Sequence, residues 1–131
     1  MTTKEERMRK VNLEAGLNQF SDLWRPKIIA ELNDYKVQLV RVQGDWVWHK
    51  HDETDELFLV IAGHLTLQMR RWDMKLGPGD LFVVPKGVEH CPRASEVCQL
   101  LLIEPFGTPN TGDAGGERTA PEERLSDGST S

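Results

Sequence analysis

The feature that most constrains this 131-residue chain is a series of short apolar runs separated by glycine and proline. Runs of this kind predict strands, because β-branched and aromatic side chains suit a pleated sheet while Gly and Pro suit turns. The expected strands are Lys27–Leu32, Tyr35–Gln43, Trp46–His51, Glu56–Ala62, Leu65–Met69, Met74–Leu76, Leu81–Val84 and Val97–Ile103. Such closely spaced strands favour an all-β sandwich or barrel, and a jelly roll suits this strand number.

Helical periodicity is confined to the segment before these runs. Leu13, Leu17, Phe20 and Trp24 recur at helical spacing, and Pro26 ends the segment. This predicts a short N-terminal helix within residues 13–24. Residues 1–12 are charged and are expected to form a flexible N-terminus, so the folded domain should span residues 13–106.

Residues 107–131 form a polar tail, in which 14 of 25 residues are Gly, Pro, Ser or Thr. A segment with so few apolar side chains does not bury enough surface to order itself. We therefore expect a flexible C-terminal extension. The alternative is that residues 110–113 (Asn-Thr-Gly-Asp) dock back on the body.

Composition excludes several classes of protein. With 16 basic and 21 acidic residues the net charge is −5, which makes nucleic acid an unexpected partner. No apolar run approaches the roughly 20 residues of a membrane span, and the N-terminal residues lack an apolar signal segment, so we expect a cytoplasmic protein with no membrane partner. Cys91 and Cys98 are then expected to be free thiols.

Three histidines and a glutamate are placed where they can converge. His49 and His51 lie two apart in an expected strand, so both imidazoles face one side. Glu56 follows after a four-residue polar turn, and a neighbouring strand can bring His90 beside them. Three imidazoles and one carboxylate form a mixed nitrogen and oxygen donor set that suits a divalent transition metal. Since a chain of this length needs no metal to build a core, a functional role for the metal is favoured.

Two spaced motifs extend this pattern. The first is Gly44-x4-His49-x-His51-x4-Glu56-x6-Gly63, and the second is Gly79-x5-Pro85-x-Gly87-x2-His90. The sequence from about residue 35 to 104 resembles the cupin superfamily, and within it the small single-domain bacterial cupins. The resemblance implies a double-stranded β-helix and assigns His49, His51, Glu56 and His90 as ligands of one Mn, Fe, Ni or Zn ion. The spacer before His49 is one residue shorter than the commonest family pattern, and Ala94 replaces a usual Asn that is not a ligand.

Several side chains near the motifs have two interpretations. Asp55 competes with Glu56 as the carboxylate ligand, but Glu56 fits the spacing to Gly63. Phe58 and Val60 share the face of Glu56 and are candidates to line a pocket, or are ordinary interior residues. Arg41 and Gln43 are candidate polar contacts for a ligand, or ordinary surface groups.

The remaining candidates carry weaker signals. Trp46 and Trp48 are expected on the face away from the ligands, with ligand stacking as the alternative. His64 is expected to be structural or exposed rather than a ligand. Cys91 is expected to be a packed thiol, although it adjoins His90, and Cys98 is expected in the core.

The family resemblance specifies a fold more closely than a reaction. We expect a small metalloenzyme, of dioxygenase, isomerase or lyase type, that acts on a small polar organic molecule. The alternative is a non-catalytic cupin that binds a metal or a small ligand as a sensor or carrier. Because an exposed sheet edge is a liability, we also expect a homodimer whose contact includes residues 13–32 and outward-facing apolar side chains.

Overall fold

The computed structural model describes residues 2–125, and strands dominate it. The elements in chain order are α1 (Lys4–Arg7), α2 (Leu13–Leu17), β1 (Lys27–Leu32), β2 (Tyr35–Asp45), β3 (Glu56–Ala62), β4 (Leu65–Met69), β5 (Asp73–Leu76), β6 (Leu81–Val84), β7 (His90–Pro105) and β8 (Glu123–Arg124). The all-β jelly-roll prediction is confirmed. Within the described residues, no helix is long and apolar enough to cross a bilayer.

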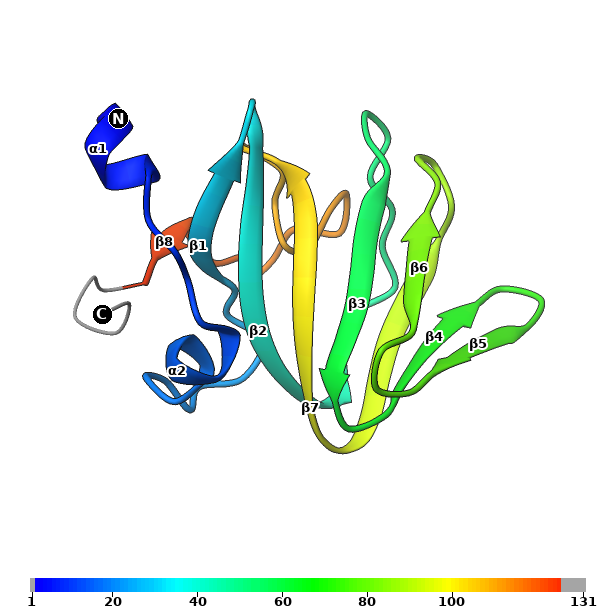
Figure 1. Ribbon diagram of the computed structural model, residues 1–131. Helices are drawn as coiled ribbons and strands as arrows, with labels where there is room; N and C mark the ends of the chain where they lie inside the picture. The colour runs from blue at the N-terminus through cyan, green and yellow to red at the C-terminus, as the bar shows by residue number, and fades with distance from the viewer. Residues whose placement is uncertain (1, 126–131) are drawn as a thin grey trace.

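The longest strand, β7, connects two layers of sheet. Its first residues pair with β4, while its later residues pair with β2 on one side and β3 on the other. The strand bends where these two halves meet, at the bottom of Figure 1, and the layers diverge upward from the bend. Strands β1 and β6 extend the layer that holds β2 and β3, and β5 extends the layer that holds β4.

The core lies between the two layers. Alternate side chains of β2, β3 and the later half of β7 point inward, as expected for strands with one buried face. The buried apolar cluster includes Val42, Val60, Leu67, Cys98 and Leu100. Both cysteines are buried free thiols, as expected.

Three expected elements differ from the structure. The helix predicted within residues 13–24 ends at Leu17, and Leu23 instead bridges to β2. No regular strand covers residues 46–51, because β2 ends at Asp45, one residue after Gly44 (φ +84°), and the segment then makes only a single bridge, His49 to His90. Strand β7 begins at His90 rather than near residue 97, because pairing with β4 and β2 carries it through a polar stretch that lacks the apolar signal of a strand.

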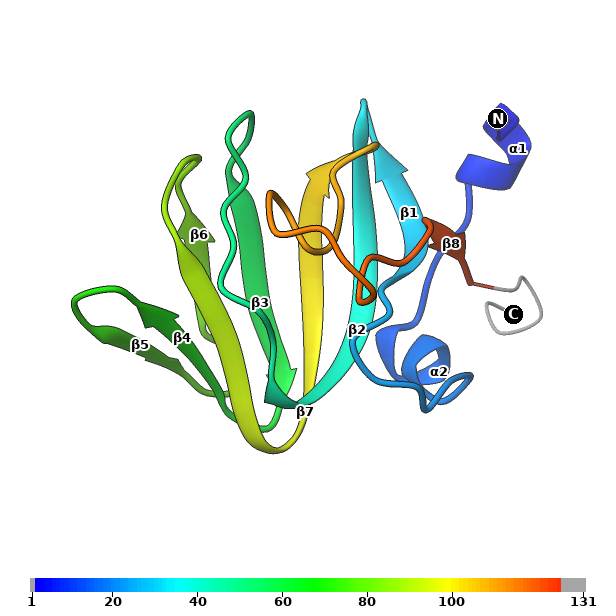
Figure 2. The same cartoon turned by 180° about the vertical axis from the view of Figure 1, so that it is seen from behind.

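The segment after β7 packs against the body as far as Leu125. It is orange in Figure 2 and passes back across β2 toward β1, where β8 pairs in parallel. Lys36 binds the Thr108 carbonyl oxygen (3.1 Å) and the Glu122 carboxylate (2.7 Å). These contacts fit the docked alternative for the start of the tail. The last part of the expected flexible segment, residues 126–131, lies outside the described residues.

We predict that Gly63→Ala destabilises the fold more than Gly79→Ala. Both glycines have positive φ (+87° and +86°), which costs an alanine about 1–2 kcal/mol. A Cβ at Gly63 would also lie 2.8 Å from the Val97 carbonyl oxygen, at the bend of β7, whereas a Cβ at Gly79 meets nothing within 4 Å. Urea unfolding should therefore show a larger loss for Gly63→Ala. Equal losses of unfolding free energy in the two variants would mean that the close approach of Gly63 to the Val97 carbonyl oxygen adds no steric cost.

Candidate metal centre

The four residues singled out by the sequence come together in the structure. His49, His51, Glu56 and His90 are all buried, and one potential ligand atom from each lies within 4.8 Å of the others. Glu56 begins β3 and His90 begins β7, while His49 is held beside His90 by two backbone hydrogen bonds of 3.0 and 2.9 Å. The His51 carbonyl oxygen accepts from the Gly87 amide at 2.8 Å, which ties the second motif to the first.

Backbone carbonyls set the orientation of two of the imidazoles. His49 Nδ1 lies 2.9 Å from the Val47 oxygen, and His90 Nδ1 lies 2.9 Å from the Val88 oxygen. A carbonyl oxygen can only accept, so each Nδ1 carries the proton and donates it. Each Nε2 is then left with its lone pair, which is the form that binds a metal.

The inner atoms of the cluster lack hydrogen-bond partners. Glu56 Oε1 lies 3.2 Å from His51 Nε2 and 3.4 Å from His90 Nε2, yet none of these atoms is hydrogen-bonded within residues 2–125. Buried polar atoms without partners are rare and costly. Unpaired nitrogen and carboxylate donors that converge on one point fit a divalent transition metal and its preference for such ligands.

Burial also shifts the ionisation of the cluster. Burial, together with the nearby His90, lowers the pKa of His49 to about 4. Burial alone would raise the pKa of Glu56, but the imidazoles of His51 and His90 hold it below its ordinary value. Near neutral pH the site therefore offers a neutral His49 and an ionised Glu56, which are the protonation states that a metal requires.

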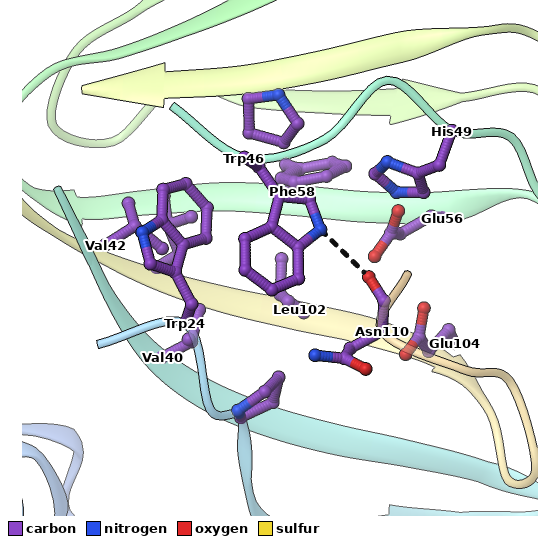
Figure 3. Close-up of a pocket in the computed structure, with 13 residues that line it drawn as sticks. Trp24, Val40, Val42, Trp46, His49, Glu56, Phe58, Leu102, Glu104 and Asn110 are labelled. Atoms are coloured by element: carbon purple, nitrogen blue, oxygen red, sulfur yellow. Dashed lines mark hydrogen bonds between the residues drawn. The ribbon is translucent and has the colours of Figure 1, made fainter. Parts of the chain in front are cut away.

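A small cavity adjoins the cluster between the two layers (Figure 3). Its free volume is about 40 Å³, and most of its wall is apolar or aromatic. Trp24 and Trp46 both line it and stack with ring centroids 4.7 Å apart. The lining residues are Trp24, Pro26, Val40, Val42, Trp46, His49, Glu56, Phe58, Pro92, Leu100, Leu102, Glu104 and Asn110.

The tail residues 110–113 lie against the ligand segment. The Trp46 indole donates to the Asn110 carbonyl oxygen at 3.1 Å, and the Asp113 carboxylate accepts from the Lys50 amide at 2.8 Å. Gly112 (φ +55°) lies so close that a Cβ there would collide with the Lys50 carbonyl oxygen and come within 2.9 Å of His49 Cδ2. The tail therefore packs directly on one of the candidate ligands.

The structure shows which of the other residues suggested by the sequence line the cavity and which do not. Phe58 lines the cavity, whereas Val60 is buried in the core beyond it. Arg41 holds the N-terminal segment by donating to the Phe20 and Leu17 carbonyl oxygens, and Gln43 is exposed; neither lines the cavity. Asp55 is exposed and accepts from the Lys86 amide, away from the cluster.

Trp24 and Glu104 line the cavity but were not assigned to it from the sequence, and Trp46 was expected there only as the alternative. Strand alternation placed Trp46 on the opposite face, but this alternation does not apply once β2 ends at Asp45. Trp24 was assigned to a helix; it instead adopts φ +63° and donates its indole N–H to the Gln43 carbonyl oxygen at 2.9 Å. Glu104 is the next alternate residue on β7 after Leu100 and Leu102, which face inward. This alternation could have predicted that Glu104 also faces inward.

Comparison with known proteins supports the sequence resemblance. The family model for the cupin domain matches residues 37–104. A cupin-2 domain containing protein from Shewanella frigidimarina is 44% identical with a TM-score of 0.72, over 72% of this chain and 93% of that one. Protein NMB1881 from Neisseria meningitidis is 31% identical with a TM-score of 0.68, over 73% of this chain and 98% of that one. The uncharacterized protein YdbB of Bacillus subtilis (strain 168) is 33% identical over 63% of this chain and 74% of its own length.

We predict that the metal-free protein loses stability as pH falls from about 6.5 to about 4. In this range the unfolded chain protonates His49, whereas the folded state keeps it neutral until its pKa of about 4. Acid therefore favours the unfolded state, by up to about 3 kcal/mol from this residue. Urea unfolding in chelator should show a shallower pH slope for His49→Gln than for the unsubstituted protein. Identical slopes would contradict a depressed pKa at His49.

Proposed function

Because the chain belongs to the cupin domain family, we propose that it binds one divalent transition metal and acts as a small metalloenzyme on a small polar organic molecule. The observation that carries this proposal is the convergence of unpaired donor atoms of His51, Glu56 and His90 in a buried cluster with His49. The cytoplasmic location and the absence of a nucleic-acid partner stay predictions from the sequence.

The proposed ligands are His49, His51, Glu56 and His90, with Mn, Fe, Ni or Zn as the metal. When bound, such a metal supplies Lewis-acid polarisation of a coordinated oxygen or, as iron, oxygen chemistry. The residues of the chain then act around it. The Val47 and Val88 carbonyls keep two imidazoles in the binding tautomer, and the aromatic wall formed by Phe58 and the Trp24–Trp46 pair limits access of water.

The cavity wall bears on the class of substrate. None of the thirteen residues that line it is Lys or Arg, whereas two carboxyls, Glu56 and Glu104, face it. A phosphate group would find no cationic side chain there to bind it. This supports a dioxygenase, lyase or isomerase that acts on an unphosphorylated molecule, in preference to one that acts on a sugar phosphate.

A non-catalytic role is the second candidate, and the size of the cavity favours it. A free volume of about 40 Å³ holds water-sized molecules, so a larger ligand requires side chains that line the cavity to move. A sensor or carrier would use such a movement to report that the ligand is bound. The two roles differ in turnover, which oxygen uptake and product analysis measure with β-diketones, keto acids and sugars. If the protein binds one of these compounds but forms no product with each of the four metals in turn, the result favours the sensor or carrier.

We predict that added metal raises the melting temperature of the unsubstituted protein and of Asp55→Asn, but not of Glu56→Gln. A metal that binds only the folded state stabilises it, by about 3 kcal/mol at a concentration one hundred times its dissociation constant. Asp55 provides the control, because it is the adjacent carboxylate but is exposed and points away from the cluster. Differential scanning fluorimetry with Mn, Fe, Ni and Zn measures the shift. An equal shift in Glu56→Gln would remove Glu56 from the ligand set.

We also propose that the protein forms a homodimer through the outer face of the sheet. This proposal keeps the outward-facing apolar side chains expected from the sequence and replaces residues 13–32, which were also expected in the contact. The pairing register places Val37, Ile103, Leu57 and Val83 side by side across β2, β7, β3 and β6, and Leu101, Leu59 and Leu81 form the next row. Leu81 and Val83 are 54% and 41% exposed, and the other five are partly exposed. Contiguous apolar patches of this kind mark interaction sites.

A second copy of the chain is the partner that this face fits. The two rows contain no charged residue, so identical faces can meet about a two-fold axis without like-charge repulsion. The helix α2 covers only the edge of the face, over Leu39.

We predict that Leu81→Lys with Val83→Lys yields a monomer, while Leu32→Lys leaves the dimer intact. Leu32 is equally exposed, at 57%, but lies on β1 outside the two rows. Sedimentation velocity over a range of protein concentrations measures the mass. A monomeric unsubstituted protein at high concentration, or a dimer that survives the double substitution, would contradict this interface.

A further inference from the structure

Glu104 is a buried acidic residue that the ligand set does not use. It is 2% exposed and lies near the end of β7, where the pairing of Leu57 with Ile103 places it beside Glu56 on the next strand. Figure 3 shows both carboxyls at the same end of the cavity. A carboxyl buried among apolar side chains is costly unless each oxygen has a partner.

The two oxygens of Glu104 differ in their surroundings. Oε2 accepts from Gln38 Nε2 at 3.2 Å and lies 3.6 Å from Lys36 Nζ. Oε1 is fully buried and has no hydrogen-bond partner within residues 2–125. Because the Lys36 ammonium can only donate, the Glu104 carboxyl turns Oε2 toward it. The other oxygen, Oε1, is then left on the side of the cavity.

Oε1 needs a polar partner whichever protonation state Glu104 adopts. An ionised carboxylate accepts a hydrogen bond at this oxygen, and a protonated carboxyl donates one from it, because donors already face Oε2. Leaving such an atom unpaired in a buried site costs more than pairing it contributes. Burial and the neighbouring Glu56 carboxyl raise the pKa of Glu104. A polar atom of the molecule that occupies the cavity would give Oε1 the hydrogen-bond partner that it lacks.

We propose that Glu104 Oε1 contacts the molecule that occupies the metal centre, and that this molecule is a small organic compound with two neighbouring oxygen or nitrogen functions. One function would reach the metal and the other Glu104. The remainder would lie against Phe58, Leu102 and Trp46 in the wall of the same cavity. Because the free volume is only about 40 Å³, these side chains must move apart to admit it. The inference rests on the proposed function, because it requires a metal at the four ligands.

Cobalt(II) and acetohydroxamate provide a direct test. Cobalt(II) reports its own coordination through its visible spectrum. Acetohydroxamate is a small chelator that binds a metal through its two oxygens and has an N–H group beside them that can donate to an ionised Glu104. Titrating cobalt(II) first and acetohydroxamate second gives two separate affinities. We expect Glu104→Met to weaken acetohydroxamate binding about tenfold while cobalt affinity changes less than about twofold. Glu104→Gln keeps a polar atom at this position and should bind the probe within about threefold of the unsubstituted protein.

Glu122→Gln is the matched control. Glu122 is the other carboxylate on Lys36, at 2.7 Å, but it does not line the cavity. If Glu104 acted only by holding Lys36, Glu122→Gln would weaken probe binding as much as Glu104→Met. We expect Glu122→Gln to leave probe binding unchanged.

The possible failures are distinguishable. If the unsubstituted protein binds no cobalt, the proposed function fails and the inference with it. If the unsubstituted protein binds cobalt but acetohydroxamate leaves the spectrum unchanged, the inference alone is overturned. The same holds if Glu104→Met binds the probe as tightly as the unsubstituted protein, or if its cobalt affinity falls as much as its probe affinity. If Glu104→Met does not fold, a crystal structure of the unsubstituted protein with cobalt and acetohydroxamate decides. Oε1 must then lie within hydrogen-bond distance of the probe, and a longer separation overturns the inference.

Discussion

The bend of β7 is the constraint on which the site depends. A single 16-residue strand pairs with β4 in one layer and with β2 and β3 in the other, so its two ends lie at the two sides of the cavity. His90 begins the strand and Glu104 lies near its end. The bend itself is crossed by Gly63, which approaches the Val97 carbonyl oxygen too closely for a side chain. Local backbone geometry therefore sets the distance between the layers and, through it, the geometry of the cavity.

Two of the imidazoles in the metal cluster, those of His49 and His90, are oriented by backbone carbonyls. Two imidazoles donate to carbonyl oxygens two residues earlier in the chain, and the His49 segment is fixed between His90 and the tail residue Asp113. Inner donor atoms, by contrast, have no protein partner. A fold that orients buried donors and leaves them unpaired is organised for a ligand from outside the chain, because unpaired buried groups reduce stability.

Sequence spacing located the four proposed ligands, because each is fixed by a turn or by a strand end that glycine and proline mark. Alternation along β3 placed Phe58 and Val60 on the face of Glu56, but it did not distinguish Phe58, which lines the cavity, from Val60, which does not. Alternation failed for Trp46, because β2 ends at Asp45 and no sequence pattern marks its end. Trp24 and Asn110 reach the cavity only through long-range packing of the segments before β1 and after β7. The alternation of side chains along β7 could have placed Glu104 on the inner face, but a charged residue near a strand end more often faces solvent.

Elemental analysis tests the central claim most directly. It compares the tag-free protein, purified without added metal and then incubated with Mn, Fe, Ni or Zn, with a His49→Ala/His90→Ala variant treated in the same way. Our account predicts about one equivalent of one of these metals in the unsubstituted protein and almost none in the variant, with both proteins folded. No metal in the unsubstituted protein after every incubation, or equal metal in the two proteins, would contradict a metal centre at these residues.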